Sequence, residues 1–413
     1  MAPGRAQVLQ GKRHHAALTL LTEAPHPLAQ RTGAIEPFRV MELLARARAL
    51  EAAGRTIVHK EIGEPDFPTP RPVCAAGVRA VEEGALFYTS ALGDPDLRAA
   101  IARYYGSRYG VDVSPGRVVV TAGSSGALLL ALGVLVDPGA GVLVTDPGYP
   151  ANRNFVRLLG GEPKGVPVGP ASRYQMTPEL LEHHWGEGTV AAILATPSNP
   201  TGTLIPPRDL ERMGTFARER GGALIVDEIY HGLVYEGEVR TALALEGGDD
   251  LFVVNSFSKF FNMTGWRLGW MVVPERYVPH VDRLAQNVYL CAPAPAQRAA
   301  LAAFEPETLA ILDARREEFR ARRDYLVPAL REIGFDIPQM PEGAFYIYAN
   351  SSRVHRDSLE LSRELLERAG VAITPGLDFG THRAAEHVRF AYTRSIEQLR
   401  VGVDRIRRYV EGR

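Results

Sequence analysis

Short apolar runs alternate with helical stretches between about residues 73 and 304. Each run consists of aliphatic or aromatic residues with no polar residue among them. The runs lie at residues 118–120, 142–144, 191–194, 223–226, 251–254 and 268–273. A strand that is apolar at every position is typical of a parallel sheet that helices cover on both faces. The pattern therefore predicts an α/β fold with a mainly parallel sheet.

Polar residues come directly after four of these runs. The clusters are Gly-Ser-Ser at 123–125, Ser-Asn-Pro at 198–200, Asp-Glu at 227–228 and Ser-Phe-Ser-Lys at 256–259. In open α/β sheets, ligands bind at the carboxyl ends of the strands. We therefore expect four loops to contribute to a single site.

The two ends of the chain follow a different pattern. Residues 40–53 carry apolar positions at helical spacing and are followed by Gly54, which predicts an amphipathic helix. Three prolines in the segment 63–70 exclude regular structure there. After residue 305 the chain is charged and helical, and we expect a helix at 310–325, an apolar aromatic run at 344–348 and helices at 358–369 and 396–410.

These patterns predict three parts in the chain. Residues 1–30 are expected to form an arm that is disordered or docks on a partner subunit. Residues 31–70 and 306–413 are expected to form a smaller α+β domain, and residues 71–305 a large domain. A chain of 413 residues with 46% hydrophobic content is too long for one ordinary core, which agrees with two domains.

Charge and cysteine content narrow the class of protein. A formal net charge of -1 argues against a general binder of nucleic acid or of membrane surfaces, so a small-molecule partner is expected. Cys74 and Cys291 lie far apart and outside any CxxC spacing, so neither a disulfide nor a metal site is predicted. The apolar run at 127–136 is too short to span a membrane, and residues 1–30 lack a secretory cleavage site. We therefore expect a cytoplasmic protein.

Lys259 is the first candidate for chemistry. It follows an apolar strand and stands among aromatic and hydroxyl residues, with few carboxylates nearby in the sequence. Burial there would disfavour the charged ammonium form, and an uncharged amine is what a lysine needs to form an imine. A solvated surface charge is the ordinary alternative for a lysine.

A glycine- and serine-rich turn at residues 123–127 precedes a helical run and is a second candidate. Backbone N–H groups at a helix N-terminus, with small side chains that permit close approach, form a site for a phosphate dianion. By itself this signal is weak, because such turns are common before helices.

Several segments together resemble one family. Residues 256–270, with Lys259 and the downstream Gly-Trp-Arg-Leu-Gly, resemble the cofactor-lysine motif of class I/II aminotransferases. Residues 196–202 are similar to the Asn-Pro-x-Gly loop of that family, and the motifs follow the family order over nearly all of the chain after residue 31. The resemblance implies the aspartate aminotransferase fold (fold type I), with a seven-stranded, mainly parallel sheet, and pyridoxal 5'-phosphate as the cofactor.

The resemblance also implies residue roles around that cofactor. Lys259 would bind it covalently as a Schiff base, and Asp227 would pair with the pyridine nitrogen and keep the ring an electron sink. A helix N-cap is the structural alternative for Asp227. In the same way, Asn199 and Tyr230 would donate to the ring 3'-oxygen, Tyr149 would stack on the ring, and Ser124, Ser125, Ser256 and Arg267 would hold the phosphate.

Three further residues are expected to act on the substrate or across subunits. Arg389 resembles the arginine that grips the substrate α-carboxylate with two hydrogen bonds, and Gly63 would contact the same carboxylate through its backbone. Tyr88 resembles the tyrosine that reaches the phosphate of the neighbouring subunit. The resemblance therefore implies a homodimer with shared active sites.

The function implied is transfer of an amino group from an L-amino acid to a 2-oxo acid, with Lys259 as general base and acid. Other enzymes of this fold remain alternatives, namely a β-elimination lyase, a racemase or a cyclopropane-forming synthase, because the same cofactor residues support them. A ligand-sensing regulator of this fold would carry an additional DNA-binding domain, for which some thirty residues before the first element are too few.

The expected amino donor is neutral, and apolar or aromatic. Bacterial aspartate-specific relatives carry a lysine in the phosphate loop and hydroxyl residues after the proline that precedes the first helix. This chain has Ser125 in the loop and Phe38 after Pro37. Burying a distal carboxylate without a cation or hydroxyl groups beside it is costly. Because this chain lacks both expected partners, acidic donors are disfavoured. Arg39 is the alternative, because its guanidinium would allow aspartate-type specificity.

Overall fold

The computed structural model describes residues 28–84, 86–237 and 239–412. By its internal contacts the chain divides into a first unit, residues 1–36, and a second unit, residues 37–413. In the first unit, the described part contains helix α2 (Gln30–Ala34), which has no buried residue. Most of the arm expected at residues 1–30 lies outside the described residues.

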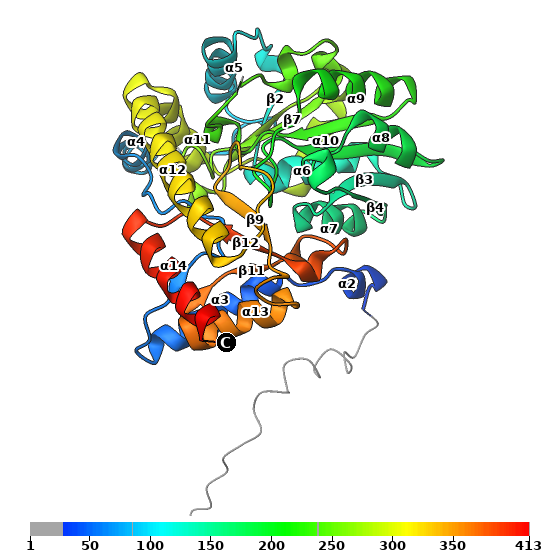
Figure 1. Ribbon diagram of the computed structural model, residues 1–413. Coiled ribbons are helices and arrows are strands. Elements are labelled where there is room, and N and C mark those ends of the chain that lie inside the picture. The colour runs from blue at the N-terminus through cyan, green and yellow to red at the C-terminus, as the bar shows by residue number, and fades with distance from the viewer. Residues whose placement is uncertain (1–27, 85, 238, 413) are drawn as a thin grey trace, which may run out of the picture. The chain divides into compact units, whose positions relative to one another are not determined.

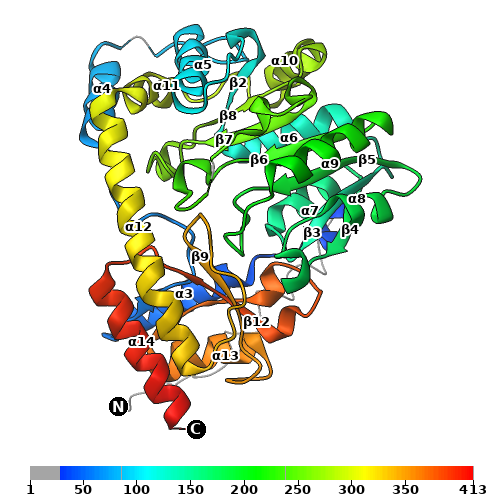
Figure 2. The ribbon, with the colours of Figure 1, turned by 45° about the horizontal axis from the view of Figure 1, so that its top comes forward.

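The second unit is built around a seven-stranded sheet (Figures 1 and 2). Its strand order is β2-β8-β7-β6-β5-β3-β4, and only β8 among them runs antiparallel to its neighbours. The predicted α/β class with a mainly parallel sheet is thereby confirmed. The strands are β2 (Val118–Thr121), β3 (Gly141–Asp146), β4 (Glu162–Pro167), β5 (Thr189–Ala195), β6 (Ala223–Asp227), β7 (Phe252–Ser256) and β8 (Gly269–Val272).

Strand β4 has no counterpart among the apolar runs of the sequence. It reads Glu-Pro-Lys-Gly-Val-Pro, and Val166 is its one buried residue. An edge strand tolerates proline and polar residues, because one of its sides needs no hydrogen-bonding partner. The position of β4 at the edge, paired only with β3, explains why its sequence lacks the pattern of the inner strands.

Helices cover both faces of this sheet. Alternate side chains of the strands enter two separate apolar cores, one on each face. One face packs against α6 (Gly123–Leu135), α7 (Pro150–Leu158) and α10 (Val278–Val288). The other packs against α5 (Pro95–Tyr109), α8 (Pro178–His184), α9 (Pro207–Glu219) and α11 (Ala294–Ala300).

The remaining elements of the second unit form two small sheets with helices beside them. Strand β1 pairs with β10 in parallel, and β12 lies between β11 and β9 with antiparallel pairing. The strands are β1 (Val58–His59), β9 (Tyr346–Asn350), β10 (Val371–Ala372), β11 (Thr374–Pro375) and β12 (His387–Ala391). The helices are α3 (Arg39–Ala52), α4 (Arg71–Glu82), α12 (Pro306–Ile333), α13 (Ser358–Glu364), continued by a π turn at Leu365–Ala369, and α14 (Ile396–Glu411).

Helix α12 is the longest of these and extends well beyond the expected residues 310–325. Pro306 stands in its first turn, and Gly334, with a φ of 112°, ends it. Figures 1 and 2 show α12 lying beside α14 at one end and approaching α4 and α11 at the other. The contact division does not separate residues 71–305 from 306–413, so the expected domain boundaries stay a prediction.

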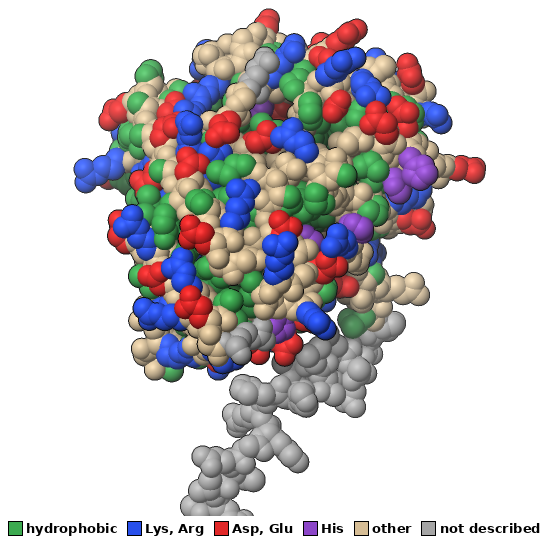
Figure 3. Space-filling view, in the orientation of Figure 1, with side chains coloured by type: hydrophobic (Ala, Val, Ile, Leu, Met, Phe, Trp, Pro, Cys, Tyr) green, Lys and Arg blue, Asp and Glu red, His purple; other side chains and the backbone are tan. Residues whose placement is uncertain are grey.

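Among the described residues, no helix is long and apolar enough to cross a membrane. On the face shown in Figure 3, acidic and basic side chains are interspersed rather than gathered into a patch of one sign. This distribution agrees with the net charge of -1.

Candidate active site

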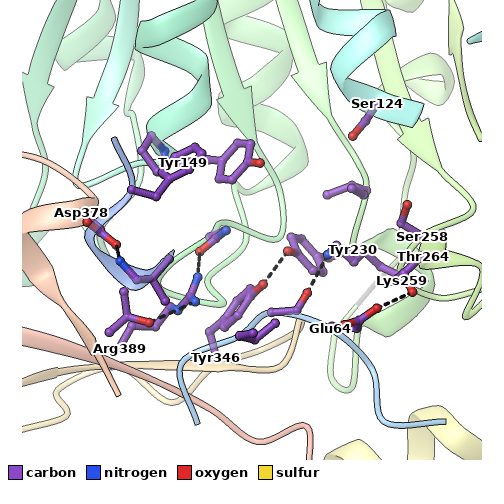
Figure 4. Close-up of a pocket in the computed structure, with 18 of the residues that line it drawn as sticks. Glu64, Ser124, Tyr149, Tyr230, Ser258, Lys259, Thr264, Tyr346, Asp378 and Arg389 are labelled. Carbon is purple, nitrogen blue, oxygen red and sulfur yellow. Dashed lines mark hydrogen bonds between the residues drawn. The ribbon is translucent and has the colours of Figure 1, made fainter. Parts of the chain in front are cut away.

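A cavity of about 470 Å³ opens where the carboxyl ends of the central strands meet residues of the small sheets (Figure 4). The four polar clusters that follow β2, β5, β6 and β7 all contribute to its lining, as expected of loops at one edge of a sheet. The lining includes ten of the residues expected at the site: Gly63, Ser124, Ser125, Tyr149, Asn199, Asp227, Tyr230, Lys259, Arg267 and Arg389.

Lys259 reaches the cavity from the loop after β7. Its Nζ donates a hydrogen bond of 2.7 Å to the carbonyl oxygen of Gly63 and lies 5.9 Å from the ring centroid of Phe345. Burial, followed by the positive charge of Arg389, lowers the pKa of Lys259 to about 8. A larger fraction of the amine is therefore uncharged near neutral pH than in an ordinary lysine, and the uncharged amine is the form that attacks a carbonyl carbon.

Asp227 is the last residue of β6 and is buried. Its Oδ1 accepts one hydrogen bond, of 3.0 Å, from the backbone N–H of Ile229. Burial raises the pKa of Asp227 to about 7. A buried carboxylate needs a cation or a protonated nitrogen beside it to remain ionised, so the residue suits a cationic group bound in the cavity.

The first turn of α6 forms one end of the cavity with Ser124 and Ser125. The guanidinium of Arg267 lies against this turn. A Cβ added to Gly123 would lie only 2.7 Å from its Nη2, which shows how close the two are. A guanidinium and the positive end of a helix repel each other unless an anion lies between them. This arrangement therefore fits a phosphate dianion.

Ser258, rather than Ser256, is the hydroxyl residue of its loop that lines the cavity. The Oγ of Ser256 donates to the carbonyl oxygen of Leu268 at 3.2 Å and accepts from the backbone N–H of Ser258 at 3.0 Å. Arg267 Nη1 donates to the Oγ of Ser258 at 3.4 Å. The structure therefore brings Ser258, and not Ser256, to the cavity, and the expected role of Ser256 at the phosphate stays a prediction.

Arg389 lies on β12 at the opposite end of the cavity from α6. Its guanidinium is held between the rings of Tyr346 and Phe379, at 4.2 and 4.8 Å from their centroids. Nη1 donates to Asn199 Oδ1 at 3.0 Å, and Nη2 donates to the carbonyl oxygen of Glu61 at 2.6 Å. These contacts fix the plane of a guanidinium that is suited to bidentate binding of a carboxylate.

Tyr346 is a site residue that the sequence pattern does not reveal, because the run at 344–348 indicates only a strand. Its hydroxyl lies 2.9 Å from that of Tyr230. A Cβ on Gly63 would lie 1.8 Å from the same hydroxyl, so only glycine fits at position 63. The close packing of Gly63 on Tyr346 places the Gly63 carbonyl oxygen beside Lys259.

The two remaining tyrosines differ in position. Tyr149, at the start of α7, lines the cavity and is 36% exposed. Figure 4 shows it on the side of the cavity away from Tyr346. Tyr88 lies outside the cavity of its own chain and is 81% exposed. The single chain therefore does not bring Tyr88 to the other site residues.

The residues of the cavity fit the three functional groups of pyridoxal phosphate. Lys259 offers an amine for its aldehyde, Asp227 a buried carboxylate for its ring nitrogen, and the first turn of α6 with Arg267 a cradle for its phosphate. All three features are properties of this chain's own residues, namely the pKa shifts of Lys259 and Asp227 and the guanidinium of Arg267 beside the N-terminus of α6.

Comparison with known proteins places the chain in a family. The model of the family "Aminotransferase class I and II" matches residues 59–406. The chain is 41% identical to valine–pyruvate aminotransferase of Mycobacterium tuberculosis over 88% of this chain and 94% of that protein. It is 34% identical to aspartate aminotransferase of Thermotoga maritima over 94% of this chain and all of that protein.

A solved structure supports the same grouping. The crystal structure of an aminotransferase from Mycobacterium tuberculosis matches with a TM-score of 0.90 and 39% identity, covering 94% of this chain and 100% of that one. The expected family and fold are therefore confirmed. The chain belongs to the class I and II aminotransferases, a family that depends on pyridoxal phosphate and moves amino groups between amino acids and 2-oxo acids.

Proposed function

We propose that this aminotransferase takes its amino group from a neutral L-amino acid, apolar or aromatic, and passes it to a 2-oxo acid. The observation that carries the proposal is the composition of the cavity wall beside Arg389. Phe38, Val40, Met41 and Phe379 line it there. An apolar wall favours an apolar side chain, because its burial removes apolar surface from water.

The proposed roles rest on the family resemblance, and the position of these residues in one cavity supports them. Bound pyridoxal phosphate supplies an electron sink for the pair of electrons left when the substrate loses its Cα proton. Lys259 would hold the cofactor and, once the substrate amine has displaced it, its free amine would move that proton, while Asp227 would keep the ring nitrogen protonated. Arg389 would orient the substrate through its α-carboxylate, and Asn199 and Tyr230 would donate to the ring 3'-oxygen.

The cations of the cavity support a neutral donor. Among the described lining residues they are Lys259, Arg267 and Arg389, and each has a proposed role already. Arg39 is not part of the lining, and its Nη1 donates to the carbonyl oxygen of Leu377 at 3.1 Å. This contact supports a structural role for Arg39 rather than recognition of a distal carboxylate.

Assembly and location are part of the proposal. We propose a homodimer in which Tyr88 completes the site of the partner subunit, and the 81% exposure of Tyr88 supports this. We propose a cytoplasmic location, which the two free cysteines, Cys74 and Cys291, support.

A donor panel tests the proposed function. Purified enzyme loaded with pyridoxal phosphate is assayed with one 2-oxo acid acceptor and with valine, leucine, phenylalanine, alanine, aspartate or glutamate as donor. We expect the highest kcat/KM with a neutral donor, unchanged preference in Arg39→Ala, and no activity in Lys259→Ala. A preference for aspartate above tenfold, about 1.4 kcal/mol, that disappears in Arg39→Ala would instead establish the aspartate-type alternative.

Product analysis in the same assay separates the other enzymes of this fold. Transamination requires the 2-oxo acid acceptor and yields its amino acid. Products formed without an acceptor would identify a lyase, racemase or synthase instead.

A further inference from the structure

The N-terminus of α3 is capped from a distant part of the chain. Phe38 occupies the cap position and offers no hydrogen-bonding side chain. The carboxylate of Asp378 takes this role, because its Oδ1 accepts from the backbone N–H of Arg39 at 2.8 Å and its Oδ2 from that of Val40 at 2.9 Å. A carboxylate at this end of a helix is favourable both as a hydrogen-bond acceptor and against the helix dipole.

The turn that Asp378 caps is also the apolar wall of the cavity. Phe38, Val40 and Met41 all line the cavity, and Asp378 lines it beside them. Figure 4 shows the carboxylate of Asp378 turned toward this turn of α3. One side chain therefore holds the wall in place and puts a negative charge at its edge.

The segment that carries Asp378 is anchored to the large sheet. Arg153 Nη2 donates to the carbonyl oxygen of Asp378 at 3.3 Å. The backbone N–H of Gly148 donates to the carbonyl oxygen of Phe379 at 2.9 Å. Asp146, at the end of β3, accepts from the backbone N–H of Thr381 at 3.0 Å. Residues 378–381 are thus held from outside, so the position of the cap is set by the fold rather than by α3.

Opposing effects act on the ionisation of Asp378. Burial raises the pKa of Asp378, while the two backbone N–H groups and the positive charges of Arg389 and Arg39 act in the opposite direction. Both carboxyl oxygens of Asp378 accept hydrogen bonds. A carboxylate accepts equally well with both oxygens, whereas a carboxylic acid uses one of them as an O–H donor.

We propose that Asp378 is the positioning residue that determines donor specificity: it fixes the first turn of α3 as an apolar wall and repels a carboxylate at the far end of a donor side chain. This inference rests on the proposed function and adds the residue that excludes acidic donors. A distal carboxylate that enters this part of the cavity meets a like charge. Among the described lining residues the cations are Lys259, Arg267 and Arg389, each with another proposed role, so both aspartate and glutamate are disfavoured.

The test is the ratio of kcat/KM for leucine to that for glutamate in the enzyme loaded with pyridoxal phosphate. Asp378→Asn removes the charge and keeps one acceptor oxygen, and we expect the ratio to fall at least tenfold. The matched control is Asp357→Asn. Asp357 caps α13 by accepting from the N–H groups of Leu359 and Glu360 and does not line the cavity, so its ratio should stay within twofold of wild type.

A second variant separates wall position from charge. Asp378→Ser also removes the charge but is shorter, so the turn of α3 loses its fixed position. We expect KM for leucine to rise severalfold, and KM for alanine, whose side chain is too short to need that wall, to rise by a smaller factor. The Ser variant also provides the ratio if the Asn variant folds poorly.

The outcomes distinguish this inference from the proposed function. A wild-type enzyme that transaminates neutral donors, together with an unchanged ratio in both Asp378 variants, overturns the role of Asp378 and leaves the function intact. A cofactor-loaded wild type that transaminates no donor overturns the proposed function itself. The leucine-to-glutamate ratio could also fall equally in Asp357→Asn and Asp378→Asn. That result would overturn the role of Asp378 in specificity, because loss of any helix cap would then have the same effect.

Discussion

Asp227 is buried and Lys259 is partly buried, and the pKa of each is shifted in the direction that favours its neutral form. Burial raises the pKa of Asp227 to about 7 and lowers that of Lys259 to about 8. Desolvation penalises both charged forms, and the hydrogen bonds of these side chains, one each to backbone groups, do not compensate. The residues are thus arranged for a ligand that the chain itself does not supply.

The cofactor-free enzyme is expected to lose stability as pH rises from about 4 to about 7. The folded-state pKa of Asp227, about 7, lies above its value in the unfolded chain, so the folded state binds the proton more tightly. This stabilisation is complete below about pH 4, declines between the two pKa values and is lost above the folded pKa, by at most roughly 4 kcal/mol in total. The amide of Asp227→Asn cannot ionise, so this variant should not lose stability in this way as pH rises.

The measurement is the free energy of unfolding of both cofactor-free proteins in denaturant between pH 5 and 8. We expect the wild type to weaken relative to Asp227→Asn by a few kcal/mol over that range. Saturation with pyridoxal phosphate is the control, because a protonated ring nitrogen would pair with ionised Asp227 and reduce the difference. Parallel curves for the two cofactor-free proteins would show that Asp227 has an ordinary pKa.

At the scale of elements, the junction between β2 and α6 brings the helix N-terminus to the cavity. Gly123 begins α6 with a φ of 73°, a conformation that residues with a side chain rarely adopt. The absence of a Cβ also leaves room for Arg267 beside the helix. The backbone at Gly123 therefore controls both the direction of the helix and the position of the guanidinium.

Gly123→Ala is expected to weaken binding of pyridoxal phosphate at least about tenfold, because the new Cβ displaces Arg267 from the phosphate end. Gly139→Ala is the matched control. Gly139 also has a positive φ, 85°, but a Cβ there would meet no atom within 4 Å. Both variants should lose about 1 kcal/mol of stability from backbone strain.

Titration of each cofactor-free variant with pyridoxal phosphate, followed by absorbance, gives the Kd. Only Gly123→Ala should shift it. Equal Kd values in the two variants would mean that strain in the backbone, and not the position of Arg267, governs any change.

At the scale of the whole molecule, the exposed aromatic pair Phe87 and Tyr88 calls for an explanation. Their exposures are 80% and 81%, high for large aromatic side chains. The proposed homodimer explains Tyr88 by placing it in the site of the partner subunit. One site would then take Lys259 from its own chain and Tyr88 from the other.

Mixing two inactive variants tests the shared site. We expect Lys259→Ala and a Tyr88→Ala variant to regain activity after subunit exchange, since one of the two sites in each heterodimer then holds both wild-type residues. With random exchange, roughly one quarter of the wild-type activity is expected. Verified heterodimers without recovered activity would contradict the shared site, provided each parent alone is inactive.

Much of the architecture could be predicted from local sequence. The runs that became β2, β3, β5, β6, β7 and β8 are apolar at each position because both faces of the sheet are buried. Polar residues directly after such runs must lie at one edge of a parallel sheet, so Asp227 and Lys259 were predictable as neighbours of one site. These features depend on periodicity and on chain neighbours, which a sequence displays.

Other features were decided only by the tertiary structure. Asp378 caps a turn that lies 338 and 339 residues away in the chain, and Tyr346, on β9, packs against Gly63 in the loop after β1. Ser258 lines the cavity whereas Ser256 bonds to the carbonyl oxygen of Leu268, a difference that depends on which way each side chain points after β7. No local pattern encodes these contacts, because they arise where segments distant in sequence meet. The sequence by itself therefore determined the sheet and the chemistry at its edge, whereas long-range packing decided which residues shape the space for the substrate.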